Sequence, residues 1–573
     1  MSVSLRRFWL QALGLAVLLV AVVPIATDGH ILMSDEGVYL AQARELSHGS
    51  WSAERTNLDI DRAGALTPVT DGGAVADRVV RYAKHPLFPL VLTPAYRVAG
   101  PTGPLLVSVF GAWSAAVVAA FIARLLKQEC APWVLWLAGI GSPLFFDAYI
   151  VVAHTLAAAC AGLAFLGVSR ALDGSRPRHL LYALPAVAAV VALRSEGLIF
   201  AAILGAVVVV MSLGWPPFRK VSWSTTAVGA GVLAVGGLTY LAEKVAVSRI
   251  IDSDLTPSPL SSLNSAAMDP LSGAWASLLR PFYGGWESAT LILPLVVLGV
   301  WLAAIALRIL PARPLLPLVA ISAAAVASIG LWFWPPGLVT GLLVTSPLIL
   351  PGLIWLTLAD LGRPVVTRAL FVVGATAVGV VLLNYRVGGA AEWGGRFFHL
   401  LLPILLPVAL LGLDNARRVL TRQQLWVAIV AATAVTVSIA GSVVTTQIDM
   451  RENVADFVEG TVAAVHTFEQ SEPDEDRLLV VPVMLHNDGV DRYFWNTDLD
   501  MLASTPIRGL GVLLDSMEAA GRDRFVITTT VDPARLTVLL TPRLRDRGWR
   551  VAGAMPTPEG MGAVYLLEKG PAT

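Results

Sequence analysis

Long apolar runs recur along this chain up to residue 445, and they leave little freedom in how it can fold. A transmembrane helix needs about 17 to 25 apolar residues, and thirteen runs approach that length. Lipid offers backbone groups no hydrogen-bonding partner, so such runs cross a bilayer as helices. The chain is 56% hydrophobic and 14% charged, against roughly 25% charged residues in a soluble domain. The sequence therefore predicts an α-helical polytopic membrane protein.

Basic residues between the runs predict the orientation. Short loops rich in Lys and Arg stay in the cytoplasm, and here they occur at every second connection. The expected spans are 8–26, 104–126, 131–149, 151–169, 180–194, 197–213, 222–242, 289–308, 315–334, 337–358, 368–384, 397–412 and 425–445. The short runs 180–194 and 197–213 could form one kinked helix, but that would put later basic loops on the wrong side, so a hairpin is expected. The N-terminus is then cytoplasmic and the C-terminus extracytoplasmic.

The connections divide the chain into two parts. Residues 1–446 are expected to form the transmembrane domain, with long outer segments at 27–103 and 243–288. From residue 447 the pattern is that of a soluble domain, in which apolar strands alternate with helical segments. The expected strands are LLVVPVML (478–485), RFVITTT (524–530) and AVYLLEK (563–569). Residues 447–573 are thus expected to form a small extracytoplasmic α/β domain.

Charge and cysteine content argue against several classes of partner and site. The formal net charge is zero, which gives no reason to expect nucleic acid as a partner. Cys130 and Cys160 are the two cysteines of the chain, too few for a disulfide framework or a thiolate metal site. Arg far outnumbers Lys in a chain rich in Ala, Val and Gly, which indicates a GC-rich bacterial genome and hence a bacterial plasma membrane.

Ionisable side chains gather at one end of the expected spans. Such residues are costly near lipid and mark functional sites. Those at or near outer ends are Asp35, Glu36, His85, Asp147, His154, Arg194, Glu196, Arg386, Glu392 and Arg396. The inner halves of the spans are almost purely apolar. This arrangement suits an enzyme at the outer leaflet, whereas a transporter is expected to carry polar groups near the midplane.

Five motifs occur in a distinctive order. They are an acidic pair after the first span (Asp35 and Glu36), HPLFP (His85 to Pro89), SPLFFDAYIVVAHTLAAA (142–159), LRSEGLIF (193–200) and GGAAEWGGRFFHLLLPILLP (388–407). Together they resemble the membrane glycosyltransferases of the C superfamily, which includes protein mannosyltransferases and lipid A aminoarabinose transferase. The resemblance runs through most of the transmembrane part and does not extend to the C-terminal domain.

The resemblance implies a reaction. The donor would be a sugar on a polyprenyl phosphate, and an acceptor hydroxyl would attack its anomeric carbon with inversion. A carboxylate of the first outer loop would be the base, which makes Asp35 the candidate and places Glu36 beside it. Base catalysis of this kind typically contributes about 10²–10⁴ in rate. The alternative is structural, because the sequence SDE begins a helical run and Ser34 or Asp35 would serve as its N-cap.

The remaining candidates have more than one interpretation. Arg396 suits a lipid phosphate, because a planar guanidinium forms paired hydrogen bonds with it, and Arg386 is a second candidate; the alternative for Arg396 is an interfacial anchor. Arg194 and Glu196 could simply pair with each other.

The acidic residue that related sequences often place near Val152 and Ala153 is absent here, and Asp147 could substitute for it. No HxH or HxxxH spacing surrounds His85 or His154, so neither is predicted to bind a metal. No cofactor is expected, although the adjacent carboxylates leave room for a divalent cation.

The sequence thus predicts an integral membrane glycosyltransferase that moves one sugar, a hexose or pentose, to a cell-envelope acceptor on the extracytoplasmic face. Its expected partners are a polyprenyl-phosphate sugar, the bilayer, and an envelope glycan, glycolipid or protein as acceptor. Two alternatives remain: a lipid or polysaccharide transporter, and a noncatalytic envelope assembly protein.

Overall fold

The computed structural model of this chain describes most of its 573 residues. Those outside the description are 1–2, 28–30, 56, 62–72, 76, 174–176, 213–222, 252–273, 275–276, 280–291, 310–340, 385–392, 472–476, 485–492, 531–532, 558–561 and 571–573. The expected span 315–334 and the candidates Arg386 and Glu392 therefore lie outside the described residues.

The chain divides into two compact units. The first unit comprises Met1–Ala26, Leu105–Glu243 and Ala267–Gln447. The second comprises Thr27–Pro104, Lys244–Ala266 and Ile448–Thr573.

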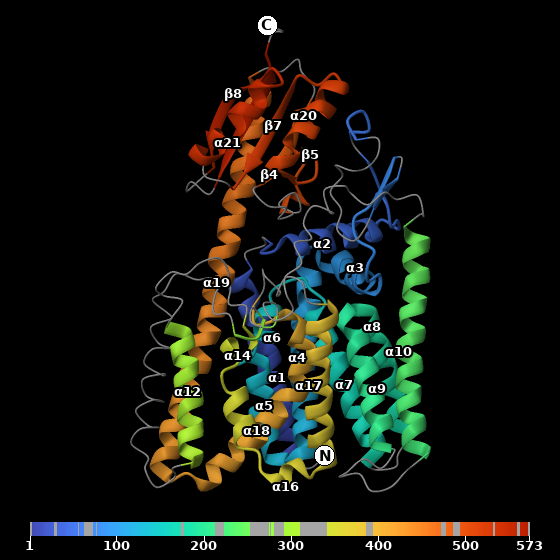
Figure 1. Cartoon of the computed structure of the whole chain (residues 1–573), viewed down its shortest axis with the longest axis vertical. Coiled ribbons are helices and arrows are strands. Elements are labelled where there is room, and N and C mark those ends of the chain that lie inside the picture. The colour runs from blue at the N-terminus through green and yellow to red at the C-terminus, as the bar shows by residue number, and fades with distance from the viewer. Residues whose placement is uncertain are drawn as a thin grey trace. The chain divides into compact units, whose positions relative to one another are not determined.

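Helices dominate the first unit (Figure 1). Its elements are α1 (Val3–Ala26), α4 (Thr102–Leu126), η1 (Gln128–Cys130), α5 (Ala131–Ile140), α6 (Leu144–Asp147), α7 (His154–Asp173), η2 (Pro177–His179), α8 (Leu180–Leu193), α9 (Ser195–Ser212), α10 (Trp223–Ile250), α12 (Ile292–Ile309), α14 (Leu342–Thr345), α15 (Ile349–Ile354), α16 (Leu358–Leu361), α17 (Pro364–Asn384), η6 (Arg396–Leu401), α18 (Leu402–Val419) and α19 (Arg422–Gln470). Three of these elements, α4, α10 and α19, extend into the second unit. Eight helices among the described residues are long and apolar enough to cross a membrane. The predicted class, a multi-pass helical membrane protein, is confirmed.

Two expected spans are not continuous helices. The run 131–149 is divided into α5 and α6 at Gly141, just before Pro143. The run 337–358 is described only from residue 341 and contains the short helices α14 and α15, with Ser346 between them in a non-helical conformation before Pro347. A residue before proline is driven out of the helical region by its ring. Hydropathy alone could not detect these breaks.

The expected hairpin at 180–213 is present as two helices, α8 and α9. Arg194 between them has extended backbone angles, φ −151° and ψ 140°. The close approach depends on Gly197, where a Cβ atom would lie 2.1 Å from the carbonyl oxygen of Val190. Any larger residue there would separate the two helices.

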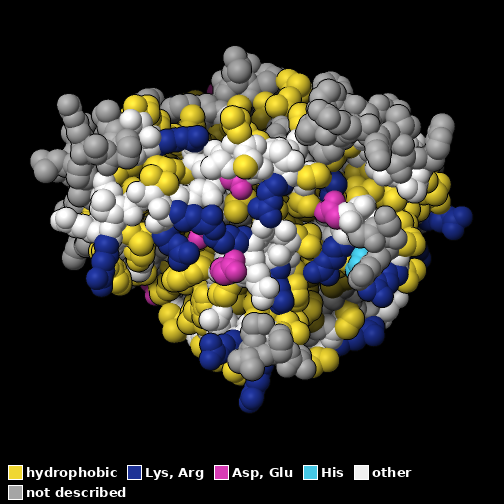
Figure 2. Space-filling model, turned by 90° about the horizontal axis from the view of Figure 1, so that it is seen from below, with side chains coloured by type: hydrophobic (Ala, Val, Ile, Leu, Met, Phe, Trp, Pro, Cys, Tyr) yellow, Lys and Arg dark blue, Asp and Glu magenta, His cyan; other side chains and the backbone are white. Residues whose placement is uncertain are grey.

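Lys and Arg side chains are numerous on the face of the molecule seen from below in Figure 2. This is the end of the first unit that carries the N-terminus of α1 and the short helix α16 (Figure 1). Arg417 and Arg418 lie there beside Asp414, at 3.1 and 3.5 Å. The basic loops found in the sequence thus include a group that folds onto one end of the bundle.

The C-terminal part of the second unit is built on a mixed sheet. Its strands are β4 (Leu479–Met484), β5 (Asp500–Met501), β6 (Thr505–Pro506), β7 (Arg524–Thr529), β8 (Trp549–Pro556) and β9 (Ala563–Lys569), and its helices are η8 (Ile507–Gly509), α20 (Leu510–Ala519) and α21 (Pro533–Arg545). The order is β5-β4-β7-β9-β8, with β6 also paired to β4. Pairs β4–β5, β4–β6 and β4–β7 are parallel, whereas β9 is antiparallel to β7 and β8. The three predicted strands are confirmed.

Side chains along these strands alternate between the two faces of the sheet, and a hydrophobic core forms on each face. Val481 and Ile527 face one side, where residues of α20 and α21 are packed. Val480 and Val526 face the other, against Val465 in the last turns of α19. Successive side chains of a strand point to opposite faces of the sheet. A strand made of consecutive apolar residues is therefore expected to be buried on both faces.

The first outer segment folds with this domain. It contains α2 (Ser34–Ser47), α3 (Leu87–Ala99) and a small antiparallel sheet, β1 (Ala53–Glu54), β3 (Arg78–Val80) and β2 (Gly73–Val75). Ile60 belongs to the core beneath α20 and α21, and the Asn57 amide donates to Asp500 at 2.7 Å. The first outer segment and the C-terminal domain therefore share one hydrophobic core.

Candidate functional site

Two motifs that are about 250 residues apart meet in the first unit, at the turn before η6. Gly394 and Gly395 both have φ +68°, a left-handed conformation that glycine adopts without strain. A Cβ atom on Gly394 would lie 2.4 Å from Pro143. Trp393 stacks on Phe146, with ring centroids 5.4 Å apart and planes 15° apart. The glycines of WGGRFF thus let this turn pack directly on the SPLFFD segment.

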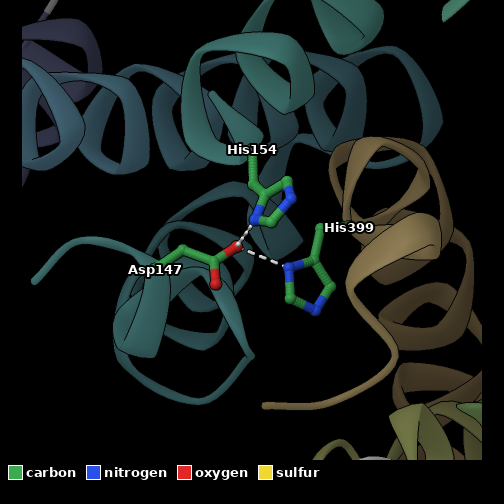
Figure 3. A group of neighbouring side chains, drawn as sticks. All are labelled: Asp147, His154 and His399. Carbon is green, nitrogen blue, oxygen red and sulfur yellow. Dashed lines mark hydrogen bonds and ion pairs between the residues drawn. The ribbon is translucent and has the colours of Figure 1, made fainter. Parts of the chain in front are cut away.

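Asp147, His154 and His399 point toward one another beneath this turn (Figure 3). Nδ1 of His399 lies 2.5 Å from Oδ2 of Asp147, and its Nε2 lies 3.0 Å from the carbonyl oxygen of Gly394. Nδ1 of His154 is 3.7 Å from the same Oδ2. Asp147 and His399 are fully buried, and His154 is 3% exposed. The side chains come from α6, α7 and η6, so the group ties three segments together.

This geometry requires an additional proton within the group. A carbonyl oxygen only accepts hydrogen bonds, and so does an ionised carboxylate. His399 can therefore donate to both partners only as an imidazolium; otherwise the carboxyl group of Asp147 must carry the proton. In either case the pair holds one proton more than an ionised Asp with a neutral His. A bound cation could take the place of that proton.

The same three residues are also suited to a metal ion. Each offers one ligand atom, and these atoms lie within 4.8 Å of one another. Two imidazoles and one carboxylate form a donor set that proteins use for transition metals. The sequence prediction excluded His154 because no second histidine stood at a close spacing, and the fold supplies that histidine from 245 residues further along the chain.

Arg194 and Glu196 form a bidentate pair. Nε and Nη2 of Arg194 lie 3.0 and 3.1 Å from the two carboxylate oxygens of Glu196, which is buried. The alternative in which they pair with each other therefore describes the structure. The Arg194 guanidinium carbon also lies 5.8 Å from the Phe397 ring centroid, and that of Arg396 lies 4.8 Å from it. Phe397 is thus the common contact of two guanidinium groups.

Arg396 is half-buried, directly after the two glycines, at the start of η6. Stacking on an aromatic ring leaves the hydrogen-bonding edge of a guanidinium available. The glycines themselves are buried against the protein, so the half-exposed group at this position is the Arg396 guanidinium.

In the second unit, Glu36 has a structural role. Its Oε2 accepts hydrogen bonds from the backbone N–H groups of Leu32 and Met33, at 2.7 and 2.9 Å. Its Oε1 lies 3.6 Å from Nη2 of Arg451, and both side chains are buried. The N-cap is Met33 rather than Ser34 or Asp35, so the carboxylate that caps the helix is Glu36, acting from its first turn. Asp35 is half-buried in that turn.

His85 is buried immediately before α3. The HPLFP motif packs on the helix that carries the acidic pair, because Phe88 meets Tyr39 edge to face at 5.0 Å. The first two motifs therefore meet in the second unit, as the other three do in the first.

A cavity of about 410 Å³ in the second unit lies beside α2. Gly37, Val38 and Ala41 of α2 line it, together with Trp495 and Asp498 of the C-terminal domain. Val38 is three residues after Asp35, and residues at this spacing share a helix face. The volume is in the range of small-molecule sites, about 300–1,000 Å³.

Sequence reasoning missed His399 and Arg451. His399 stands three residues after Arg396, inside a motif that had been singled out, so its position in that motif was the available signal. The sequence around Arg451 contains no such signal, because an arginine in a long polar stretch looks like a solvent-exposed side chain.

No family model and no curated protein matches the chain. Among solved structures, ArnT from Cupriavidus metallidurans bound to undecaprenyl phosphate is 16% identical with a TM-score of 0.46, over 96% of this chain and 98% of that one. The archaeal oligosaccharyltransferase AglB from Archaeoglobus fulgidus, in complex with an inhibitory peptide and a dolichol-phosphate, is 12% identical with a TM-score of 0.43, over 93% and 70%. These neighbours belong to the C superfamily of membrane glycosyltransferases.

Proposed function

We propose that the protein is an integral membrane glycosyltransferase, which transfers a sugar from a polyprenyl-phosphate donor to an envelope acceptor on the extracytoplasmic face. The observation that carries the proposal is the convergence of the motifs: segments 142–159, 193–200 and 393–407 meet around Phe397 and His399. Polar residues so far apart in sequence gather in this way at sites and not in a simple helix bundle.

In the proposed reaction the acceptor hydroxyl oxygen attacks the anomeric carbon of the donor. The bond from that carbon to the phosphate oxygen breaks, polyprenyl phosphate leaves with the electron pair, and configuration inverts. Asp35, which lies in the first turn of α2, takes the hydroxyl proton. Arg396 binds the donor phosphate and stabilises the charge that develops on it.

The acceptor is proposed to enter the cavity beside α2. An acceptor there would approach the helix face that carries Asp35, and Trp495 offers an amphipathic ring against which a sugar can pack. The C-terminal domain would then guide the acceptor without performing chemistry. The proposed orientation follows from the basic face in Figure 2, which is cytoplasmic by the positive-inside rule.

The proposal is tested with purified protein in liposomes that contain a radiolabelled polyprenyl-phosphate sugar and envelope extract as acceptor. We expect label to move to the extract, and Arg396→Lys to raise the donor KM about tenfold or more, because Lys keeps the charge but loses the planar fork. Arg178→Lys, at an exposed arginine, is the matched control. Movement of lipid across the bilayer without sugar transfer would instead favour the transporter.

A further inference from the structure

We propose that Asp147, His154 and His399 form a divalent metal site, with a zinc-like ion held by one carboxylate oxygen and two imidazole nitrogens. The proposal does not depend on the glycosyltransferase assignment. It also differs from the sequence expectation, which placed any cation at Asp35 and Glu36, because Glu36 is engaged by two backbone N–H groups and Arg451.

The ligand atoms are close to metal-binding spacing. Zinc bonds of about 2.0–2.2 Å in tetrahedral geometry place neighbouring ligand atoms roughly 3.3–3.5 Å apart. Oδ2 of Asp147 and Nδ1 of His154 are 3.7 Å apart, a distance too long for a hydrogen bond and near that value. Oδ2 and Nδ1 of His399 are 2.5 Å apart, so this pair must separate by about 1 Å to admit the ion.

The surroundings of His399 match those of a metal ligand. A histidine that binds metal usually donates its other ring N–H to a carbonyl or carboxylate. Nε2 of His399 lies 3.0 Å from the carbonyl oxygen of Gly394, so a proton on Nε2 donates to that carbonyl group and leaves the Nδ1 lone pair for the metal. The left-handed turn at Gly394 and Gly395 holds that carbonyl in place.

Asp147 supplies an observation that is independent of the ligand spacing. Its second oxygen, Oδ1, is buried and has no hydrogen-bond partner among the described residues. A buried ionised carboxylate is costly unless it is paired or coordinates a metal. A divalent ion on Oδ2 would compensate the charge that the carboxylate shares between its two oxygens.

Neighbouring charges reduce the affinity without excluding the ion. Arg194 and Arg396 both act electrostatically on His154. Arg194 is neutralised by its bidentate pair with Glu196, and Arg396 is held against Phe397. Three protein ligands leave one tetrahedral position for water or an anion.

Metal content of the full-length protein tests the proposal. The protein is purified in detergent through a tag without histidine, loaded with Zn²⁺, and dialysed against a weak chelator. We expect about one equivalent of Zn²⁺ in the wild type, and less than a tenth of that in Asp147→Asn and His154→Gln. Asp173→Asn, which alters a carboxylate paired with Arg368 at 3.4 Å, is the matched control and should retain the ion.

A second measurement covers the case in which a variant fails to fold. Zn²⁺ should raise the Tm of the wild type in proportion to the logarithm of its concentration, and should not raise that of His154→Gln. Wild-type protein with no Zn²⁺ above the dialysis background and no shift in Tm would overturn the proposal. Equal retention by the wild type and both ligand variants would also overturn it.

Discussion

Replacing Glu36 by Gln should separate stability from activity in the acidic pair. The two oxygens of Glu36 have different tasks: Oε2 accepts from the N–H groups of Leu32 and Met33, and Oε1 faces Arg451. The Gln amide can place its oxygen at the Oε2 position and keep both backbone bonds. Its NH₂ group would then face the Arg451 guanidinium, which is also a donor.

The expected cost comes from the ion pair. Removing one partner of a buried pair typically costs about 3–5 kcal/mol. The oxygen and nitrogen are 3.6 Å apart, beyond hydrogen-bond distance, so the lower end, about 3 kcal/mol, applies. For a unit of this size that corresponds to a fall in Tm of about 6–12 °C. Glu36→Ala should cost a further 1–3 kcal/mol, roughly, because two buried N–H groups also lose their acceptor.

Asp35→Asn should behave in the opposite way. Asp35 is half-buried, so the nearly isosteric change should cost less than about 1 kcal/mol. If Asp35 is the base, kcat should fall by roughly 10²-fold or more with the donor KM unchanged.

Thermal unfolding in detergent, followed by circular dichroism, and transfer kinetics on the same preparations measure both effects. Glu36→Gln with a Tm within 2 °C, roughly, of the wild type would refute the structural role given to Glu36. Wild-type turnover in Asp35→Asn would remove Asp35 as the base and direct attention to Asp147 or Glu196.

Three further predictions follow from the fold. Gly394→Ala should lower the Tm and the retained activity together, since the residue has φ +68° and its Cβ would meet Pro143 at 2.4 Å; the same substitution at Gly374, where a Cβ meets nothing within 4 Å, should be tolerated. Trp495→Ala should raise the acceptor KM several-fold and leave the donor KM unchanged; an equal rise in both would argue against an acceptor cavity. Cysteines at Asp71 and Thr497 should react with an impermeant maleimide in intact cells, whereas one at Val221 should not, and labelling of Val221 would reverse the proposed orientation.

Local patterns determined much of this protein. Apolar runs of the length of a bilayer specify helices because backbone groups in lipid must bond within their own segment, and α1, α4, α7 and α9 follow them closely. The strands β4, β7 and β9 were also readable, because short apolar runs between turns have few other uses. The separation of α8 from α9 followed from the count of basic loops.

The tertiary structure decided the rest, because it depends on residues far apart in the chain. Nothing near His154 in sequence indicates that His399 will lie beside it, since the packing of η6 on α7 creates that contact. The ion pair of Glu36 likewise depends on Arg451, which α19 supplies some 415 residues later. The sequence determined which segments are apolar enough to cross a membrane and which residue types gather at one end of them, and only long-range packing determined which of those residues touch.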